Sequence, residues 1–405
     1  MSRRAVLWTA FVVVHAVVAW FGFSMPNMPM GVVYLVYEPW ARDALSGRGI
    51  VGIDAEWVYP QLALVPRLLA QGLEWIAGYE VAWALMVTGL DAIAFALLIG
   101  RGRSAGRTAG AVFWLVYLAL LGPIAMYRID AVTVPLAVAG CLWLIGRPFL
   151  ASVLLTVAAW IKVWPAALLA AALIAVRRRL TIVGGALLAS AVTVWIVIAM
   201  GGAQHLLGFV AGQTGRGLQL EAPVSAFYLW RAIAGVDGSF IYYDRDMLTF
   251  QVTGPAVDAV IAVMTPLLLA VVAGVAALGA FKAWRGASFA ALFPPLSLGL
   301  VLALIVVNKV GSPQFLTWLI APVVLGLVID RRRWRPVAIL ALVAALLTQI
   351  VYPLLYGQLL VAGPLAAGVL TARNLTMLAL LVWAIVRLAR VPQRARHPVV
   401  DRSAH

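Results

Sequence analysis

Charged residues and cysteine are scarce in this chain of 405 residues. Only 11% of the residues are charged, whereas a soluble domain carries about 25%. The single cysteine, Cys141, lies in an apolar run, so a disulfide framework is excluded and a cysteine-based metal site is disfavoured. The four histidines are scattered along the chain. We therefore expect neither a metal nor a cofactor.

Several catalytic motifs are also missing. The sequence has no Gly-rich loop that ends in Lys-Ser or Lys-Thr, no His-Glu-x-x-His and no Gly-x-Ser-x-Gly. These absences argue against a P-loop nucleotidase, a zinc protease and a serine hydrolase of the common types.

Apolar residues dominate instead. They make up 64% of the chain, and the mean hydropathy is +1.01. Apolar runs of about 20 residues recur, long enough to cross a hydrocarbon core of about 30 Å as helix, and strict period-2 alternation is absent. The sequence predicts an all-α, polytopic transmembrane bundle of about 10–13 helices, with a further interfacial helix around 60–76. The predicted spans lie near residues 5–24, 82–100, 108–126, 131–146, 149–161, 165–176, 180–200, 256–281, 287–307, 315–329, 336–353 and 366–386.

The basic residues predict the orientation, because positively charged flanks stay cytoplasmic. With the N-terminus inside, 20 of the 30 basic residues fall on the cytoplasmic side, and 12 of the 15 acids fall on the other side. The net charge of +15 is thus a topology signal and requires no nucleic-acid partner. We expect a multi-pass protein of the plasma membrane with both termini in the cytoplasm and an uncleaved first helix.

Two long segments, 25–80 and 201–255, are predicted to be extracytoplasmic. They are rich in aromatic residues, and long connections in compact proteins are usually functional or disordered. We expect one transmembrane domain over 1–390 whose active site lies in these two segments, followed by a basic cytoplasmic tail, 391–405. The cytoplasmic loops are too short to form a domain for nucleotide-sugar chemistry.

Carboxylates of the first segment are candidate general bases. Glu38, Asp54 and Glu56 each stand close to Trp, Tyr or Pro, and apolar walls can tune the pKa of a carboxylate. Asp54 and Glu56 are favoured because Trp57-Val-Tyr-Pro follows them directly. The alternative is that they are solvated loop carboxylates, which is our interpretation of Asp43.

Isolated charges beside the apolar helices are further candidates. Arg128 and Asp130 stand close together between two predicted helices, where charges are expensive and mark a site by default. A structural Arg–Asp pair is the alternative. Lys162 and Lys309 each follow an apolar run at the outer face and suit an anionic phosphate, whereas a snorkelling lysine is the alternative. Asp91 is either a proton relay or, in our preferred interpretation, one side of an interhelical hydrogen bond.

Together these stretches resemble the polytopic, C-type glycosyltransferases of family 87, actinobacterial enzymes that take mannose or arabinofuranose from polyprenyl phosphate. The resemblance spans about residues 5 to 330 and implies a C-type glycosyltransferase fold. The stretches that carry it are Tyr34-Leu-Val-Tyr-Glu-Pro-Trp, Trp57-Val-Tyr-Pro-Gln-Leu-Ala-Leu-Val-Pro, Tyr127-Arg-Ile-Asp-Ala, Ala159-Trp-Ile-Lys-Val-Trp-Pro and Lys309-Val-Gly-Ser-Pro-Gln-Phe-Leu-Thr-Trp.

The resemblance implies an inverting transfer of a sugar, mannose above others, to a cell-envelope glycolipid or polysaccharide. A carboxylate deprotonates the acceptor hydroxyl, and polyprenyl phosphate leaves with its charge matched by Arg or Lys. The candidate base is Glu38, Asp54, Glu56 or Asp130. The candidate phosphate ligands are Arg128, Lys162 and Lys309. The candidate substrate contacts are Tyr34, Tyr37, Trp57, Tyr59, Gln314 and Trp318.

The sequence departs from the family at one position. Relatives commonly carry an Asp just before the first Tyr motif, where this chain has Val32 and Val33. Another carboxylate then acts as the base, or the chain is a non-catalytic protein of envelope assembly. A transporter or lipid flippase with the same topology is the other alternative, although it would need charges at mid-membrane depth on several helices.

Overall fold

The computed structural model describes residues 2–212, 215–245 and 247–393. Within them, eight helices are long and apolar enough to cross a membrane. The chain is therefore a multi-pass membrane protein. These helices are α1 (Arg3–Ser24), α4 (Tyr79–Ile99), α5 (Ala105–Leu121), α9 (Arg179–Ala199), α12 (Val257–Trp284), α13 (Phe289–Val306), α15 (Arg331–Gln349) and α17 (Pro364–Ala389).

Four apolar helices are shorter, with 10 to 14 residues each. They are α6 (Asp130–Trp143), α7 (Pro148–Ile161), α8 (Pro165–Ala175) and α14 (Ile320–Ile329). A 3-10 turn, Pro313–Leu319, precedes α14. With the eight longer helices, they account for the twelve apolar helices that the sequence predicts, of which these four are too short to span a bilayer alone. A helix also lies in the stretch 60–76, as α3 (Leu64–Gly72), and its interfacial position stays a prediction.

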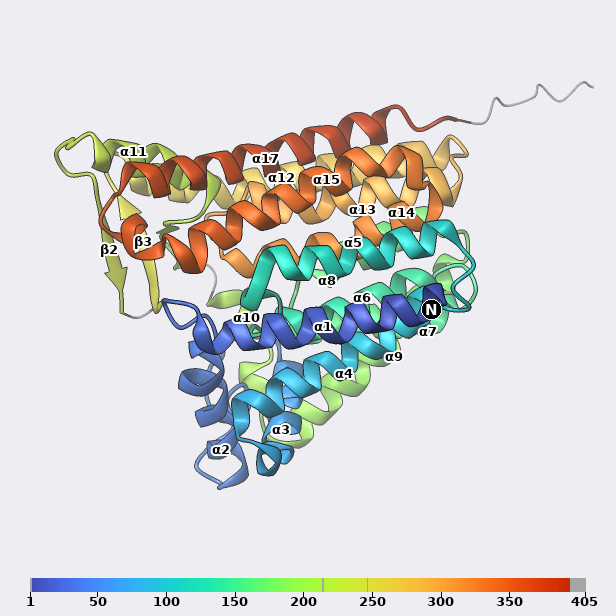
Figure 1. Ribbon diagram of the computed structural model, residues 1–405, viewed down its shortest axis with the longest axis horizontal. Coiled ribbons are helices and arrows are strands. Elements are labelled where there is room, and N and C mark those ends of the chain that lie inside the picture. Colours follow the sequence, from blue (N-terminus) through green and yellow to red (C-terminus); the bar gives the residue numbers. More distant parts are fainter. Residues whose placement is uncertain (1, 213–214, 246, 394–405) are drawn as a thin grey trace, which may run out of the picture.

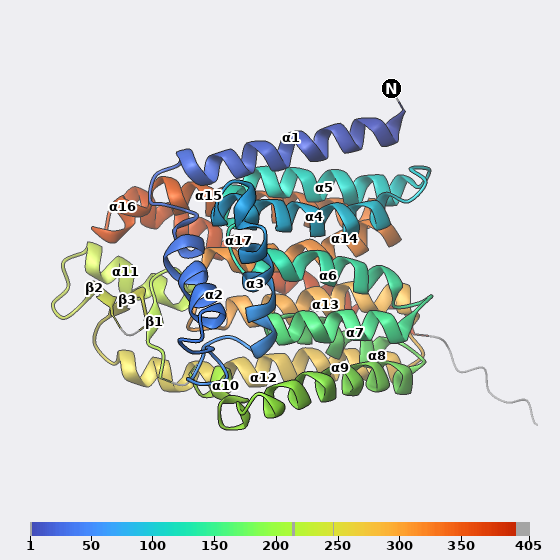
Figure 2. The same cartoon turned by 90° about the horizontal axis from the view of Figure 1, so that it is seen from below.

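The remaining elements gather at one end of the bundle, which we name the loop end (Figures 1 and 2). The first outer segment, 25–78, contains a π-helical turn (Val33–Tyr37), α2 (Glu38–Leu45) and α3. The second outer segment, 200–256, contains α10 (Gly208–Ala211) and α11 (Ala226–Ile233). The short α16 (Tyr356–Leu360) lies between α15 and α17.

The second outer segment also contains an antiparallel sheet of three short strands, in the order β1-β3-β2. The strands are β1 (Leu218–Gln219), β2 (Phe240–Asp244) and β3 (Thr249–Thr253). The chain is mostly helical, as the all-α prediction has it, but these three short strands were not predicted. Aromatic and β-branched residues fill β2 and β3, and such residues favour strands.

The opposite end, which we name the basic end, carries the short Arg-rich connections. The start of α1 and the end of α17 both lie there (Figure 1). Lys282, near the end of α12, donates hydrogen bonds to the carbonyl oxygens of Ala389 and Val391 and so ties two helices together at this end. Most of the predicted basic tail, residues 394–405, lies outside the described residues.

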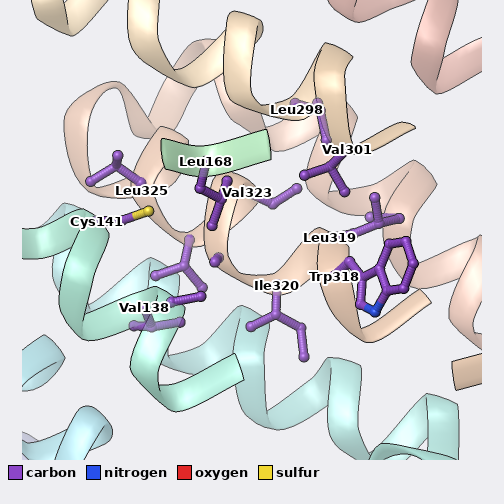
Figure 3. Close-up of a cluster of buried hydrophobic side chains, with 14 of the residues drawn as sticks. Val138, Cys141, Leu168, Leu298, Val301, Trp318, Leu319, Ile320, Val323 and Leu325 are labelled. Atoms are coloured by element: carbon purple, nitrogen blue, oxygen red, sulfur yellow. The ribbon is translucent and has the colours of Figure 1, made fainter. Parts of the chain in front are cut away.

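The core is apolar and lies among the short helices. Val138 and Cys141 of α6, Leu168 of α8 and Val301 of α13 meet residues of α14 there (Figure 3). At the basic end, α5 lies against the backbone of α14, because a Cβ at Gly106 would lie 2.6 Å from the carbonyl oxygen of Val328. Small residues allow this close approach between membrane helices.

The two ends predict a labelling experiment. Cysteines at Ser46 and Asp237, both exposed at the loop end, should react with an impermeant thiol reagent in intact cells. Cysteines at Arg103, Arg178 and Arg333, exposed at the basic end, should stay protected until the membrane is opened. The native Cys141 is buried and gives no background. Labelling of the second group alone would reverse the proposed orientation.

Candidate functional site

A buried arginine surrounded by aromatic rings organises the first outer segment. The guanidinium carbon of Arg67 lies 4.2 Å from the ring centre of Tyr37, 4.8 Å from that of Trp57 and 4.7 Å from that of Tyr59. Trp40 completes this aromatic box at 5.3 Å. A cation over desolvated aromatic faces gains up to about 2 kcal/mol from cation–π attraction. The box therefore links the π-helical turn, residues 57–59 and α3.

The guanidinium of Arg67 is held almost entirely by these rings. The side chain is fully buried, and its Nη1 donates a hydrogen bond to the carbonyl oxygen of Ala63 at 2.6 Å. Its Nε and Nη2 have no hydrogen-bond partner among the described residues. Burial lowers the pKa of Arg67, and the neighbouring tyrosines oppose this shift. Sequence reasoning missed Arg67 because its aromatic partners converge only in the fold.

Tyr59 connects this box to a second group of cations. The Nζ of Lys162 lies 4.6 Å from the centre of the Tyr59 ring. Arg216, of the second outer segment, is close enough to Tyr59 for that residue to raise the pKa of Arg216, and close enough to Lys309 to lower the pKa of Lys309. We name Lys162, Arg216 and Lys309 the cation cluster. It joins the two predicted phosphate ligands Lys162 and Lys309 to Arg216, which the sequence analysis did not single out.

The cation cluster is electrostatically costly. Burial lowers the pKa of Lys309, and the positive charge of Arg216 lowers it further. Burial also lowers the pKa of Arg216, while Tyr59 and Asp244 oppose that shift. The Nε of Arg216 is buried and has no hydrogen-bond partner among the described residues. An anion bound beside these side chains would offset the repulsion between Arg216 and Lys309 and could accept a hydrogen bond from the Nε of Arg216.

Local structure sets the position of each cation. Lys162 directly follows α7 and adopts an extended conformation (φ −152°, ψ 135°) before Pro165 begins α8. Lys309 lies in the loop between α13 and the 3-10 turn, and Arg216 lies just before β1. The cluster therefore forms where the turn between α7 and α8 and the loop after α13 meet the second outer segment.

Gln219 of β1 fixes the Lys309 loop. Its backbone N–H donates to the carbonyl oxygen of Lys309 at 3.0 Å. Its side-chain Oε1 accepts hydrogen bonds from the N–H of Gly311 and the hydroxyl of Ser312, both at 3.2 Å. Gly311 packs so closely on the backbone of Ala222 that no Cβ would fit. These contacts hold the loop in one conformation beside β1.

Asp130 is the predicted carboxylate that lies deepest. It begins α6 and is fully buried, and its Oδ1 accepts a hydrogen bond from the indole N–H of Trp318 at 2.6 Å. Trp318 in turn stacks on Trp164, with ring centres 5.7 Å apart. The Oδ2 of Asp130 has no hydrogen-bond partner among the described residues. A buried carboxylate oxygen without a partner calls for an explanation, and a catalytic role is one.

The carboxylates of the first outer segment have other contacts. Glu38 forms an ion pair with Arg42 at 2.5 Å, and Arg42 also contacts Glu74 at 2.6 Å. Burial raises the pKa of Glu38 although Arg42 opposes the shift. Asp54 is exposed, and its Oδ2 accepts a hydrogen bond from the N–H of Ile50 at 2.7 Å, while Glu56 is exposed as well. These side chains stabilise turns or face solvent.

Arg128 binds backbone atoms. Its Nη1 donates to the carbonyl oxygens of Pro29 at 2.6 Å and Tyr127 at 2.8 Å, which ties the first outer segment to the turn before α6. The hydroxyl of Tyr37 accepts a hydrogen bond from the N–H of Ile129 in the same turn.

The other predicted substrate contacts differ in their surroundings. The hydroxyl of Tyr34 donates to the sulfur of Met28 at 3.1 Å. Gln314 is half-buried in the 3-10 turn before α14. Trp57 is buried in the aromatic box, and its indole N–H has no hydrogen-bond partner among the described residues.

A second buried charge pair lies beside the Lys309 loop. Glu221 is 2% exposed, and its Oε1 accepts a hydrogen bond from the hydroxyl of Tyr356 at 2.9 Å. Burial raises the pKa of Glu221, and Arg373 of α17 opposes that shift. Arg373 is buried nine residues into α17 and donates to the carbonyl oxygen of Gly311 at 3.4 Å. The sequence analysis did not single out Arg373, although it lies inside the predicted helix 366–386, and an arginine inside an apolar helix was the available signal.

Asp91 has an interhelical partner within the membrane. Its Oδ2 lies 3.1 Å from the Nε2 of His15, and both side chains are buried. The contact joins α1 to α4, in agreement with our preferred interpretation of Asp91.

Comparison with known proteins provides no family assignment: no protein-family model, curated protein or solved structure matches this chain.

Proposed function

We propose that this protein is a membrane glycosyltransferase that moves a sugar, mannose above others, from a polyprenyl-phosphate donor to a glycolipid or polysaccharide of the cell envelope. The observation that carries the proposal is the cation cluster at the loop end. Lys162, Arg216 and Lys309 come from three separate parts of the chain. Lys162 lies over the ring of Tyr59, Arg216 interacts electrostatically with Tyr59, and Lys309 interacts electrostatically with Arg216. The anionic phosphate of such a donor can accept charge-assisted hydrogen bonds from all three side chains, and its negative charge increases when it departs as a phosphate monoester.

The setting of the cluster favours a lipid-linked phosphate. Two of its members, Lys162 and Lys309, lie in connections between membrane helices. A phosphate on a membrane-embedded polyprenol would reach such positions from the bilayer. We propose the plasma membrane as the location, with both termini cytoplasmic and the loop end outside, because the charge distribution predicts that orientation.

Among the carboxylates, Asp130 fits the role of general base best. Its Oδ2 has no partner among the described residues, whereas Asp54 caps a turn and Glu56 faces solvent. In the proposed reaction Asp130 takes the proton of the acceptor hydroxyl, whose oxygen attacks the anomeric carbon. The bond from that carbon to the phosphate oxygen breaks, and the cation cluster stabilises the charge of the departing polyprenyl phosphate.

A non-catalytic role in envelope assembly is the second candidate. Val33 is fully buried in the π-helical turn, at the position where relatives of the resembled family carry Asp. A valine at this position cannot act as a general base, so activity depends on a carboxylate elsewhere in the chain. A transporter has less support, because it would need charges at mid-membrane depth on several helices, and Asp91 of α4 already contacts His15 of α1 through its Oδ2.

The cation cluster predicts weakened donor use in three variants. Lys162→Ala, Arg216→Ala and Lys309→Ala should each raise the Kd for a polyprenyl-phosphate sugar roughly 10- to 150-fold, because each removes a charge-assisted contact of about 1.5–3 kcal/mol. Arg48→Ala, which removes an exposed arginine of the first outer segment, is the matched control. Unchanged donor binding in all three variants would remove the cluster from the site.

The pH dependence of donor binding provides a separate test. Protonated Lys309 binds the phosphate, so affinity should fall as the pH rises through the lowered pKa of Lys309. Arg216→Gln removes a positive neighbour and should raise that pKa. The alkaline limb of the binding profile should then move to higher pH, even though overall affinity is weaker. Arg48→Gln should leave the limb in place, and a shift to lower pH in Arg216→Gln would contradict the arrangement.

Amide replacements should identify the base. Asp130→Asn should lower turnover by about 10²–10⁴-fold with donor binding intact. Asparagine keeps an oxygen that can accept the hydrogen bond from Trp318, so the fold should survive. Glu38→Gln, Asp54→Asn and Glu56→Gln should stay within a few-fold of the parent protein. Loss of turnover only in Asp54→Asn or Glu56→Gln would indicate that the base lies in the first outer segment. Full turnover in all four variants would remove support for the transferase.

A further inference from the structure

A groove opens at the basic end, opposite the loop end that carries the candidate site. It lies between α5 and α15, has a volume of about 550 Å³, and has Leu327 of α14 among its lining residues. Apolar side chains line it from Ala105 to Val116 on α5 and from Ala338 to Leu342 on α15. Alanines at positions 105, 109 and 338 leave the space unfilled.

Three arginines stand at the mouth of this groove. Arg3 of α1 and Arg331 and Arg335 of α15 are exposed, and the guanidinium of each has no hydrogen bond or ion pair with another described residue. The residues that line the groove include no acid. The nearest acid along the chain, Asp330, caps the N–H of Arg333 and pairs with the Arg333 side chain at 3.5 Å. The mouth therefore carries three uncompensated positive charges.

The length of the groove matches half a bilayer. Eleven residues of α15 separate Arg331 from Leu342, which corresponds to about 16 Å at 1.5 Å per residue. Half of a hydrocarbon core of about 30 Å is about 15 Å. A fatty acyl chain of one leaflet would therefore lie along the apolar wall while its head group stays at the arginines.

We propose that this groove binds an anionic glycerophospholipid from the leaflet at the basic end. The phosphate contacts Arg3, Arg331 and Arg335, and one acyl chain lies between α5 and α15. Basic pockets between membrane helices are suited to anionic lipid head groups. A free phosphate would use the mouth alone and leave the apolar wall bare, so the groove fits a lipid. This proposal is independent of the glycosyltransferase function.

The test is native mass spectrometry of the full-length protein in detergent, titrated with phosphatidylglycerol or phosphatidylcholine of the same acyl chains. The parent protein should retain one phosphatidylglycerol at concentrations at which phosphatidylcholine is lost. Replacing all three mouth arginines (R3Q/R331Q/R335Q) should raise the apparent Kd for phosphatidylglycerol roughly 100-fold. The matched control is R101Q/R103Q/R178Q, which removes three exposed arginines of the same end and should bind as the parent does.

A groove-filling variant tests the acyl chain separately. A109F/A338F keeps all three arginines and should lose phosphatidylglycerol, while its melting temperature without lipid verifies that it is folded. Soluble glycerol phosphate should not compete with the lipid at equal concentration. Equal loss in the control triple variant, retention by a folded A109F/A338F, or full competition by glycerol phosphate would each overturn the proposal.

Discussion

The attraction between one buried guanidinium and four aromatic rings underlies the arrangement of the loop end. Arg67 forms no ion pair with a carboxylate of the described residues, so the rings of the aromatic box compensate its charge. That requirement draws together the π-helical turn, residues 57–59 and α3, which are otherwise joined by irregular chain. Tyr59 belongs to the box and also contacts the ammonium group of Lys162 with its ring face. The position of the box therefore influences the position of Lys162 in the cation cluster. A buried cation without this surrounding would be expensive.

The sequence predicted the helices well because their signal is local. A run of apolar residues identifies a span, and flanking arginines identify its ends, so all twelve helices lie where they were expected. Lys162 and Lys309 could be singled out for the same reason, since each is an isolated charge next to an apolar run. The strands β2 and β3 were missed because a single short hairpin has little hydrophobic pattern amid a longer irregular segment.

Arg67, Arg216 and Glu221 could not be singled out from the sequence. Each becomes notable only through partners distant in the sequence: the rings around Arg67, Lys309 beside Arg216, and Tyr356 beside Glu221. The sequence analysis favoured Asp54 and Glu56 over Glu38, whereas our proposal of Asp130 as the base rests on contacts that the sequence does not show. Aromatic neighbours in the sequence pointed to Asp54, whereas the neighbours that enclose Asp130 include Trp318, 188 residues away.

The shortness of α6 and α7 has a consequence for how any lipid-borne substrate is handled. Each has 14 residues and is about 21 Å long, roughly 9 Å less than the hydrocarbon core. Asp130 begins α6 and Lys162 follows α7, so both can lie below the level at which the longer helices leave the bilayer. A polyprenol could then stay dissolved among the acyl chains while its polar end reacts. The reacting groups of the protein would then lie at the depth of the lipid. The long hydrocarbon tail would not have to move into water, which costs free energy.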